Sequence, residues 1–159
     1  MKFYQNKMLL TVLLASACAF TSCKDEYNIC DQNRLITMNG SFFTVTGGME
    51  VPLAASNLSI SNFNGASILT NVLNSTAFSL GLNSQIDSSK YVFTLGAGLQ
   101  ADTVTFFYNN QTIELSPECG DVDVQNLRSV RTTRNTIDSV RISNASVNNR
   151  LAQNIKVFY

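Results

Sequence analysis

DTVTFFYNNQTIEL, residues 102–115, decides the fold class of this chain. Polar and apolar residues alternate on both sides of the pair Asn109-Asn110, so each half has one apolar face: Val104, Phe106 and Tyr108, then Ile113 and Leu115. A period of two residues is typical of a half-buried strand, and adjacent Asn residues tolerate the left-handed backbone of a tight turn. The segment therefore predicts a β-hairpin that turns at Asn109-Asn110.

Seven more runs alternate in the same way, at residues 41–46, 57–61, 76–80, 91–95, 121–127, 136–143 and 153–159. Glycines and Asn pairs separate the runs, among them Gly40, Gly47-Gly48 and Asn148-Asn149. Ser, Thr and Asn make up 49 of the 159 residues, a composition that suits strand faces and turns. We therefore expect an all-β protein, a single antiparallel β-sandwich or small barrel of about nine strands. Its last strand should carry the C-terminus into a sheet.

The composition excludes several classes of function. The chain holds 11 basic and 11 acidic residues, and it has no His and no Trp. A net charge of zero gives no broad electrostatic footprint for nucleic acid, so no nucleic-acid partner is expected. Without His, the Ser-His-Asp, Cys-His and HExxH arrangements cannot be built. Asp121 and Asp123, with Glu118 near, have no calcium-loop spacing. Glu114 and Glu118 could form an acid and base pair for glycoside cleavage, but any two carboxylates four residues apart could do so. We therefore expect a non-enzymatic protein with no metal and no cofactor.

The N-terminus has the pattern of a targeting segment. Two basic residues, Lys2 and Lys7, lie near the start of the chain. An uncharged apolar run of 13 residues follows them at 8–20. That run is shorter than the about 20 residues of a membrane span, but it has the length of a signal peptide's apolar region. We expect residues 1–22 to be a cleaved lipoprotein signal peptide; the alternative is a buried N-terminal helix.

The end of the apolar run indicates a lipid anchor. FTSC at residues 20–23 resembles the lipobox of bacterial lipoproteins, in which the Cys becomes the acylated first residue of the mature chain. ASAC at residues 15–18 is a competing site, but cleavage there would leave Phe20 outside the apolar run. Two or three acyl chains, at about 0.8 kcal/mol per buried CH₂, make a durable anchor. The sequence therefore predicts lipidation at Cys23 and a lipid-anchored protein of the outer membrane.

The charged residues Lys24, Asp25 and Glu26 follow the predicted anchor directly. They look like the sorting signal that exports lipoproteins of the Bacteroidota to the cell surface. We therefore expect the domain to face outward. The alternatives are a plain polar tether and a domain that faces the periplasm.

Residues 23–29 would form the acylated Cys and its short tether, and residues 30–159 a single β domain. The charges of this mature chain are uneven. Residues 23–120 carry a net charge of −5, and residues 121–159 carry +3. The two parts can therefore attract each other within one fold.

Cys30 and Cys119 are the cysteines that remain after cleavage and acylation. Two leftover cysteines in an exported chain most often pair, and we expect a disulfide between them. Closing a loop of this length contributes on the order of 4–5 kcal/mol in the chain-entropy model. Two buried free thiols or a metal pair are the alternatives. The six residues 24–29 reach about 20 Å, so the bridged domain must sit close to the membrane.

Arg128, Arg131 and Arg134 are the candidate ligand contacts. The segment 127–135 holds these three Arg and no acid, and it is interpreted as a loop between strands. Planar guanidinium groups suit phosphate or carboxylate groups of headgroups, lipopolysaccharide or acidic glycans. The alternative is a hydrated loop that faces the acidic N-terminal part.

A family resemblance rests on Cys23, Cys30, the aromatic run 106–108, Cys119-Gly120 and the terminal run 155–159. Together these resemble a family of small, uncharacterised Bacteroidota lipoproteins. The resemblance implies the anchor, the Cys pair and the β fold, and it implies no activity. We therefore expect a surface lipoprotein with a binding or assembly role toward a protein or glycan partner.

The alternative is a carbohydrate-binding accessory lipoprotein of a glycan-uptake system. With no Trp in the chain, sugar stacking would need exposed tyrosines. The candidates in the mature chain are Tyr27, Tyr91, Tyr108 and Tyr159.

Overall fold

The computed structural model describes residues 29–159. The predicted signal peptide, Cys23 and the triplet Lys24, Asp25 and Glu26 lie outside the described residues. All regular structure from residue 29 onward is β-strand, so this part of the chain contains no helix that could span a membrane. The all-β prediction is confirmed.

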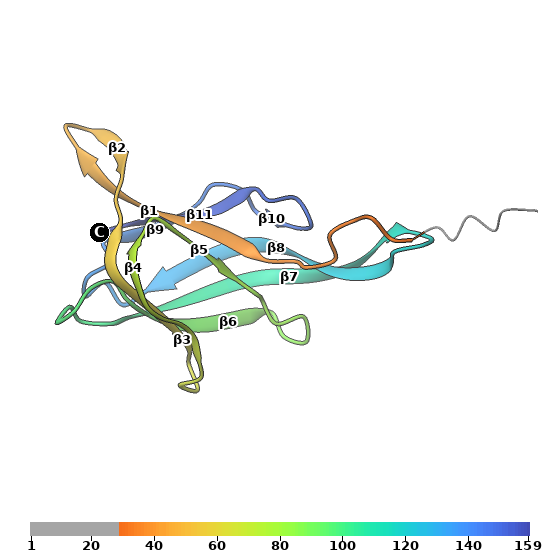
Figure 1. The fold of residues 1–159 in the computed structure, drawn as a ribbon, viewed down its shortest axis with the longest axis horizontal. Coiled ribbons are helices and arrows are strands. Elements are labelled where there is room, and N and C mark those ends of the chain that lie inside the picture. Colours follow the sequence, from red (N-terminus) through yellow and green to blue (C-terminus); the bar gives the residue numbers. More distant parts are fainter. Residues whose placement is uncertain (1–28) are drawn as a thin grey trace, which may run out of the picture.

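Within residues 29–159, eleven strands form two sheets that pack face to face (Figure 1). The first sheet has the order β2-β1-β11-β9, and β5 also pairs with β1. Its strands are β1 (Met38–Thr46), β2 (Met49–Pro52), β5 (Ala77–Leu80), β9 (Ser139–Ile142) and β11 (Gln153–Phe158). The second sheet has the order β10-β8-β7-β6-β3-β4. Its strands are β3 (Ala55–Asn62), β4 (Ser67–Ser75), β6 (Ser88–Thr94), β7 (Asp102–Ser116), β8 (Gly120–Thr132) and β10 (Ser146–Val147). This arrangement is a β-sandwich.

The first sheet is mixed, because β1 and β11 run parallel while its other pairs are antiparallel. The antiparallel prediction is therefore wrong for this one pair. The prediction that the C-terminus is built into a sheet is confirmed. β11 lies between β1 and β9, and the Tyr159 amide donates to the Phe43 carbonyl at 3.2 Å.

The core lies between the two sheets and is rich in aromatic rings. Phe78 of β5 packs against Phe42 of β1 and Phe93 of β6, with ring centroids 5.3 and 5.2 Å apart. Gly40, expected to end a run, lies inside β1 beside the Phe78 ring. A Cβ at this glycine would come within 2.2 Å of the ring's Cζ atom. Gly40 is thus part of core packing and not a strand boundary.

The predicted turn at Asn109-Asn110 is wrong. β7 runs unbroken through these residues, which pair with Asn126 and Gln125 of β8. The partner strand β8 is almost as long as β7, so the ladder continues past the Asn pair. The chain turns at residues 117–119 instead, and Gly120 follows with a positive φ of 68°.

The strand count also differs from the prediction, because two predicted runs merge into β7 and three strands were not predicted. β2 is short and follows the Gly47-Gly48 turn, and β10 has only two residues. β4 has no regular alternation of polar and apolar residues. Asn71 and Asn74 also have positive φ angles, of 51° and 52°, which distort the strand. Nearly all of β4 is exposed at the sheet edge, so burial imposes no period on it.

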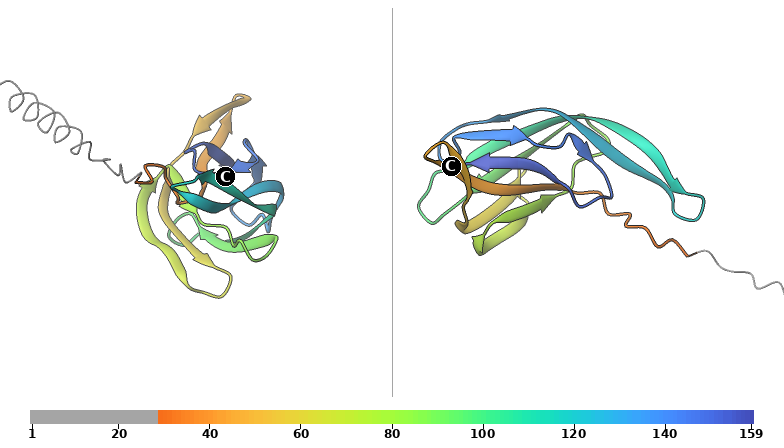
Figure 2. Two further views of the ribbon diagram at one scale, coloured as in Figure 1. Left: turned by 90° about the vertical axis from the view of Figure 1, so that its right-hand side faces the viewer. Right: turned by 90° about the horizontal axis from the view of Figure 1, so that it is seen from above.

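Cys30 and Cys119 form a disulfide, as the sequence predicts, with their Cα atoms 4.7 Å apart. The bridge fastens the start of the described chain to the tip of the long β7–β8 hairpin. In both Figure 1 and the right-hand view of Figure 2, this tip and the start of the chain lie at the end opposite the C-terminus. We call the end that holds the C-terminus, opposite the bridge, the distal end.

Candidate functional site

Two of the three candidate arginines belong to a strand. Arg128 and Arg131 lie in β8, and Arg134 lies in the turn that follows it. The loop expected at residues 127–135 is therefore wrong over residues 127–132, which belong to β8. β8 reaches Thr132 because β7 offers it partners to the end, with Thr105 opposite Arg131.

Arg131 and Arg134 lie together, and Arg128 lies apart from them. The first two line a shallow hollow of about 340 Å³ between β8 and β9, whose walls also include Thr132, Ser139 and Val140. Arg128 instead donates to the Tyr108 carbonyl at 3.3 Å and lies 3.5 Å from the Asp87 carboxylate. The structure thus brings together two of the three predicted anion contacts.

The buried carboxylate of Asp102 fixes the turn that carries Arg134. It accepts four hydrogen bonds of 2.6–2.8 Å from this turn, donated by the Thr133 hydroxyl and by the amides of Asn135, Thr136 and Ile137. Burial is the largest single influence and raises the pKa of Asp102, but the hydrogen bonds together outweigh it and the pKa is lowered. Asp102 therefore stays ionised as an anchor for the turn.

Arg134 occupies a left-handed conformation in this turn, with a φ of 59°. Few residues other than Gly, Asn and Asp adopt this region, so the surrounding contacts must hold Arg134 there. The turn is fastened on its other side as well. The Asn135 amide group donates to the Ala101 carbonyl and the Thr136 hydroxyl to the Gln100 carbonyl, both at 2.8 Å. The hollow therefore has a rigid rim.

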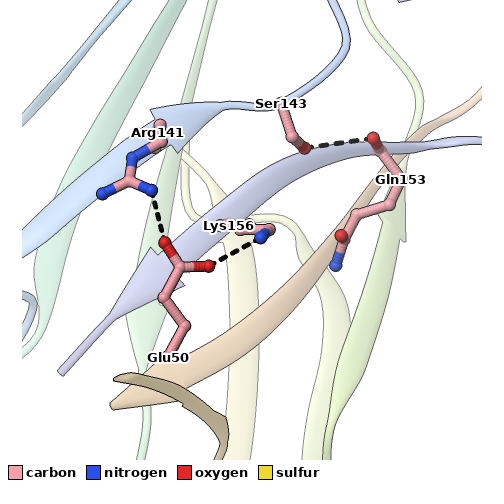
Figure 3. Close-up of polar contacts among 5 residues, drawn as sticks. All are labelled: Glu50, Arg141, Ser143, Gln153 and Lys156. Atoms are coloured by element: carbon pink, nitrogen blue, oxygen red, sulfur yellow. Dashed lines mark hydrogen bonds and ion pairs between the residues drawn. The ribbon is translucent and has the colours of Figure 1, made fainter. Parts of the chain in front are cut away.

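A second charged group lies on the outer face of the first sheet (Figure 3). We call Glu50, Arg141 and Lys156 the charge cluster. Glu50 of β2 accepts hydrogen bonds from Lys156 of β11, at 2.7 Å, and from Arg141 of β9. The hydrogen bond from Lys156 is the largest cause that lowers the pKa of Glu50. Each cation also lies over a ring, Lys156 over Phe43 and Arg141 over Phe158. The charge cluster ties the projecting β1–β2 hairpin to the sheet.

The ion pairs join the acidic N-terminal part of the mature chain to its basic C-terminal part. The described residues form three, and each joins an acid from residues 23–120 to a base from residues 121–159: Asp87 with Arg128, and Glu50 with Arg141 and with Lys156. The predicted attraction between the two parts of the chain is therefore present in the fold.

The tyrosines are not arranged for sugar stacking. Tyr91 and Tyr108 are buried, and Tyr159 is half-buried. The Tyr91 hydroxyl donates to the Gly81 carbonyl, and the Tyr108 hydroxyl donates to the Asn83 carbonyl at 3.0 Å. Tyr27 lies outside the described residues. The described tyrosines serve the core, which weakens a glycan site built on them.

Phe63 is the aromatic residue that the sequence reasoning missed. It is 61% exposed and borders a hollow of about 550 Å³, which is also lined by Ile86, Lys90, Asn62, Asn64 and Asn83. Its position directly after β3, in a stretch of Asn, Gly and Ser, was the signal that could have found it. A large apolar ring in such a turn has no core to fill.

Acidic residues do not gather into a metal site among residues 29–159, where no three His, Cys, Asp or Glu side chains lie together. Asp121 and Asp123 lie exposed on β8, and Asp123 accepts a hydrogen bond from the Thr112 hydroxyl at 2.8 Å.

Comparison with known proteins gives one match. No curated protein and no solved structure matches the chain. A family model, described as a family of unknown function (DUF6452), matches residues 57–159. The matched segment includes Cys119 and the hollow of Arg131 and Arg134, whereas Cys30 precedes it. Since the match covers well over half of the chain, this protein belongs to the DUF6452 family, whose function is unknown.

Proposed function

We propose that this protein is a lipoprotein of the outer membrane, acylated at Cys23 and carried to the cell surface by Lys24, Asp25 and Glu26. Its β domain acts by binding or assembly and not by catalysis. The observation that supports this proposal best is the separation of two sites. The Cys30–Cys119 bridge lies at one end of the molecule, and the C-terminal end of β8, whose residues line the hollow of Arg131 and Arg134, lies at the other (Figure 1).

The tether geometry orients the domain under this proposal. The residues between Cys23 and Cys30 span at most about 20 Å, so the tip of the β7–β8 hairpin would lie beside the membrane. The distal end would then point away from the lipid surface. A ligand or partner in solution would reach the distal hollow without obstruction from the bilayer.

The chemistry of the distal hollow supports binding. Guanidinium groups remain protonated at all physiological pH values, so they hold anions but do not exchange protons with a substrate. Thr132 and Ser139 add hydroxyl groups to the walls. Such a site suits carboxylate, phosphate or sulfate groups.

A second candidate is a carbohydrate-binding accessory lipoprotein of a glycan-uptake system. Phe63 favours it, because its exposed ring offers a stacking surface for a sugar in a hollow that Asn62, Asn64 and Asn83 also line. The burial of Tyr91 and Tyr108 counts against a tyrosine-based version of this role.

The anchor is tested by fractionation of cells that express the protein. Wild type should enter the detergent phase in a Triton X-114 separation, and Cys23→Ala should remain in the aqueous phase. Cys18→Ala is the matched control and should partition as wild type. Membrane partitioning of Cys23→Ala, or loss of partitioning in Cys18→Ala, contradicts the proposed anchor.

Surface export is tested separately. Changing Lys24, Asp25 and Glu26 to Ala should leave the protein lipidated but protect it from protease added to intact cells. Unchanged digestion would show that the triplet is only a tether.

A further inference from the structure

The outer face of the six-stranded sheet carries a row of side chains that we call the basic row: Phe63, Lys90, Thr105 and Arg131. The register places them side by side. The Phe63 amide donates to the Lys90 carbonyl at 3.1 Å, Lys90 pairs with Thr105 of β7, and Thr105 pairs with Arg131 of β8. Neighbouring strands lie about 4.8 Å apart, which places the backbones of Lys90 and Arg131 about 10 Å apart.

Both cations of the basic row lie over aromatic rings. The Lys90 Nζ atom is 5.2 Å from the Phe63 ring centroid, and the Arg131 Cζ atom is 5.4 Å from the Phe107 ring centroid. In the charge cluster on the other sheet, a Lys and an Arg also lie over Phe rings, but there Glu50 forms ion pairs with both cations. The three ion pairs within residues 29–159 include neither Lys90 nor Arg131. The basic row therefore has the same arrangement of Lys and Arg over Phe rings, but without a carboxylate in the position of Glu50.

Two nearby carboxylates are engaged elsewhere, and a third, Asp138, is exposed near the turn that carries Arg134. Asp87 pairs with Arg128, and Asp102 faces the interior and accepts hydrogen bonds from the turn beyond β8. Around the basic row, the outward positions of the strands hold mostly hydroxyl side chains: Ser61, Ser88, Thr94, Thr103 and Ser129. The outward strand positions directly beside the row thus hold no carboxylate.

Each end of the basic row opens into a hollow. Phe63 and Lys90 line the hollow of about 550 Å³, and Arg131 lines the distal hollow together with Arg134. A ligand that follows the row from β3 to β8 would meet three cations, one ring that is 61% exposed, and a series of hydroxyl groups. Only an extended ligand can use all of these contacts at once.

We propose that the basic row binds a linear acidic glycan, a polysaccharide that carries carboxylate or sulfate groups. Lys90, Arg131 and Arg134 pair with its anionic groups, Phe63 stacks against the apolar face of a sugar ring, and the Ser and Thr hydroxyls bond to its hydroxyl groups. This proposal rests on the carbohydrate-binding role proposed above and does not depend on the lipid anchor. A single-stranded nucleic acid fits less well, because successive bases stack on several aromatic rings, whereas the row offers one exposed ring, Phe63.

The test measures binding of the detergent-solubilised full-length protein to polygalacturonate and dextran sulfate, with neutral dextran as the uncharged probe. Wild type should bind at least one acidic polymer and not neutral dextran. The double variant Lys90→Gln/Arg131→Gln should bind about a hundredfold more weakly, since each lost ion pair of about 1.4 kcal/mol is a factor of ten. The matched control Arg34→Gln/Arg150→Gln removes the same charge from exposed positions outside the row and should bind as wild type.

Phe63→Ala separates a glycan from an acidic protein. It should weaken binding to the acidic polysaccharide severalfold and leave any binding to poly-L-glutamate unchanged. The proposal is overturned if neither acidic polysaccharide binds, if both double variants lose binding equally, or if poly-L-glutamate or anionic vesicles bind more tightly than the polysaccharides. None of these results affects the partitioning of Cys23→Ala, so a failure here is distinct from a failure of the anchor.

Discussion

Replacing Asp102 with Asn should destabilise the domain by about 2–4 kcal/mol. One oxygen of the carboxylate accepts from the Thr133 hydroxyl and the Asn135 amide, and the other accepts from the amides of Thr136 and Ile137. An Asn side chain would place an NH₂ group against one of these pairs, so at least one main-chain donor loses its acceptor. An orphaned donor costs about 1–3 kcal/mol, and the remaining bonds lose the strength that the charge gives them.

The measurement is chemical denaturation of Cys23→Ala protein, followed by far-ultraviolet circular dichroism because the chain has no Trp. Asp138→Asn is the matched control, since Asp138 is exposed near the same turn and its carboxylate accepts none of these bonds. A surface change of this kind should cost less than about 0.5 kcal/mol.

The pH dependence gives a second check. Because the folded pKa of Asp102 is lowered, its stabilising contribution is present above the unfolded pKa of about 3.9 and is lost as the pH falls through the folded pKa. The difference in stability between wild type and Asp102→Asn should therefore shrink as the pH falls below about 4. Equal midpoints at neutral pH, or a difference that does not change with pH, would refute this account of the turn.

Two further changes test the disulfide and the core. Replacing both Cys30 and Cys119 with Ser should lower the free energy of unfolding by about 2–5 kcal/mol and leave the circular dichroism spectrum of the native state unchanged; an unaltered denaturation midpoint would contradict it. Gly40→Ala should cost about 1–3 kcal/mol, because the new Cβ would collide with the Phe78 ring that packs on β1. Gly81→Ala is the control, since its Cβ would meet open space, and equal losses in the two variants would show that packing is not the cause.

Local patterning predicted the features of this fold that depend on neighbours in the sequence. The runs that became β3 and β6 alternate because one face of each is buried, so a period of two was enough to find them. The Cys30–Cys119 pair followed from counting cysteines. These predictions needed no knowledge of which strand lies beside which.

The errors arose where a distant partner overrides the local signal. Asn109-Asn110 has the chemistry of a turn, but β8 supplies an unbroken ladder and holds both residues extended. Asp102 begins a strand in the sequence, and its role as anchor for a turn more than 30 residues later depends on long-range contacts. Strand pairing brings Phe63 and Lys90 into one row with Thr105 and Arg131. The spacing of these residues in the sequence does not predict that register.

The Cys30–Cys119 bridge also determines how the domain would carry mechanical load. If the N-terminus is anchored as proposed, a pull on the lipid enters the protein at Cys30. Without the bridge, the whole tension would pass along the chain to β1 and peel its start from β5 and β11. With the bridge, part of the tension goes to the tip of the β7–β8 hairpin in the opposite sheet. Both sheets then resist the pull together, which suits a protein held against flow or against the drag of a bound polymer.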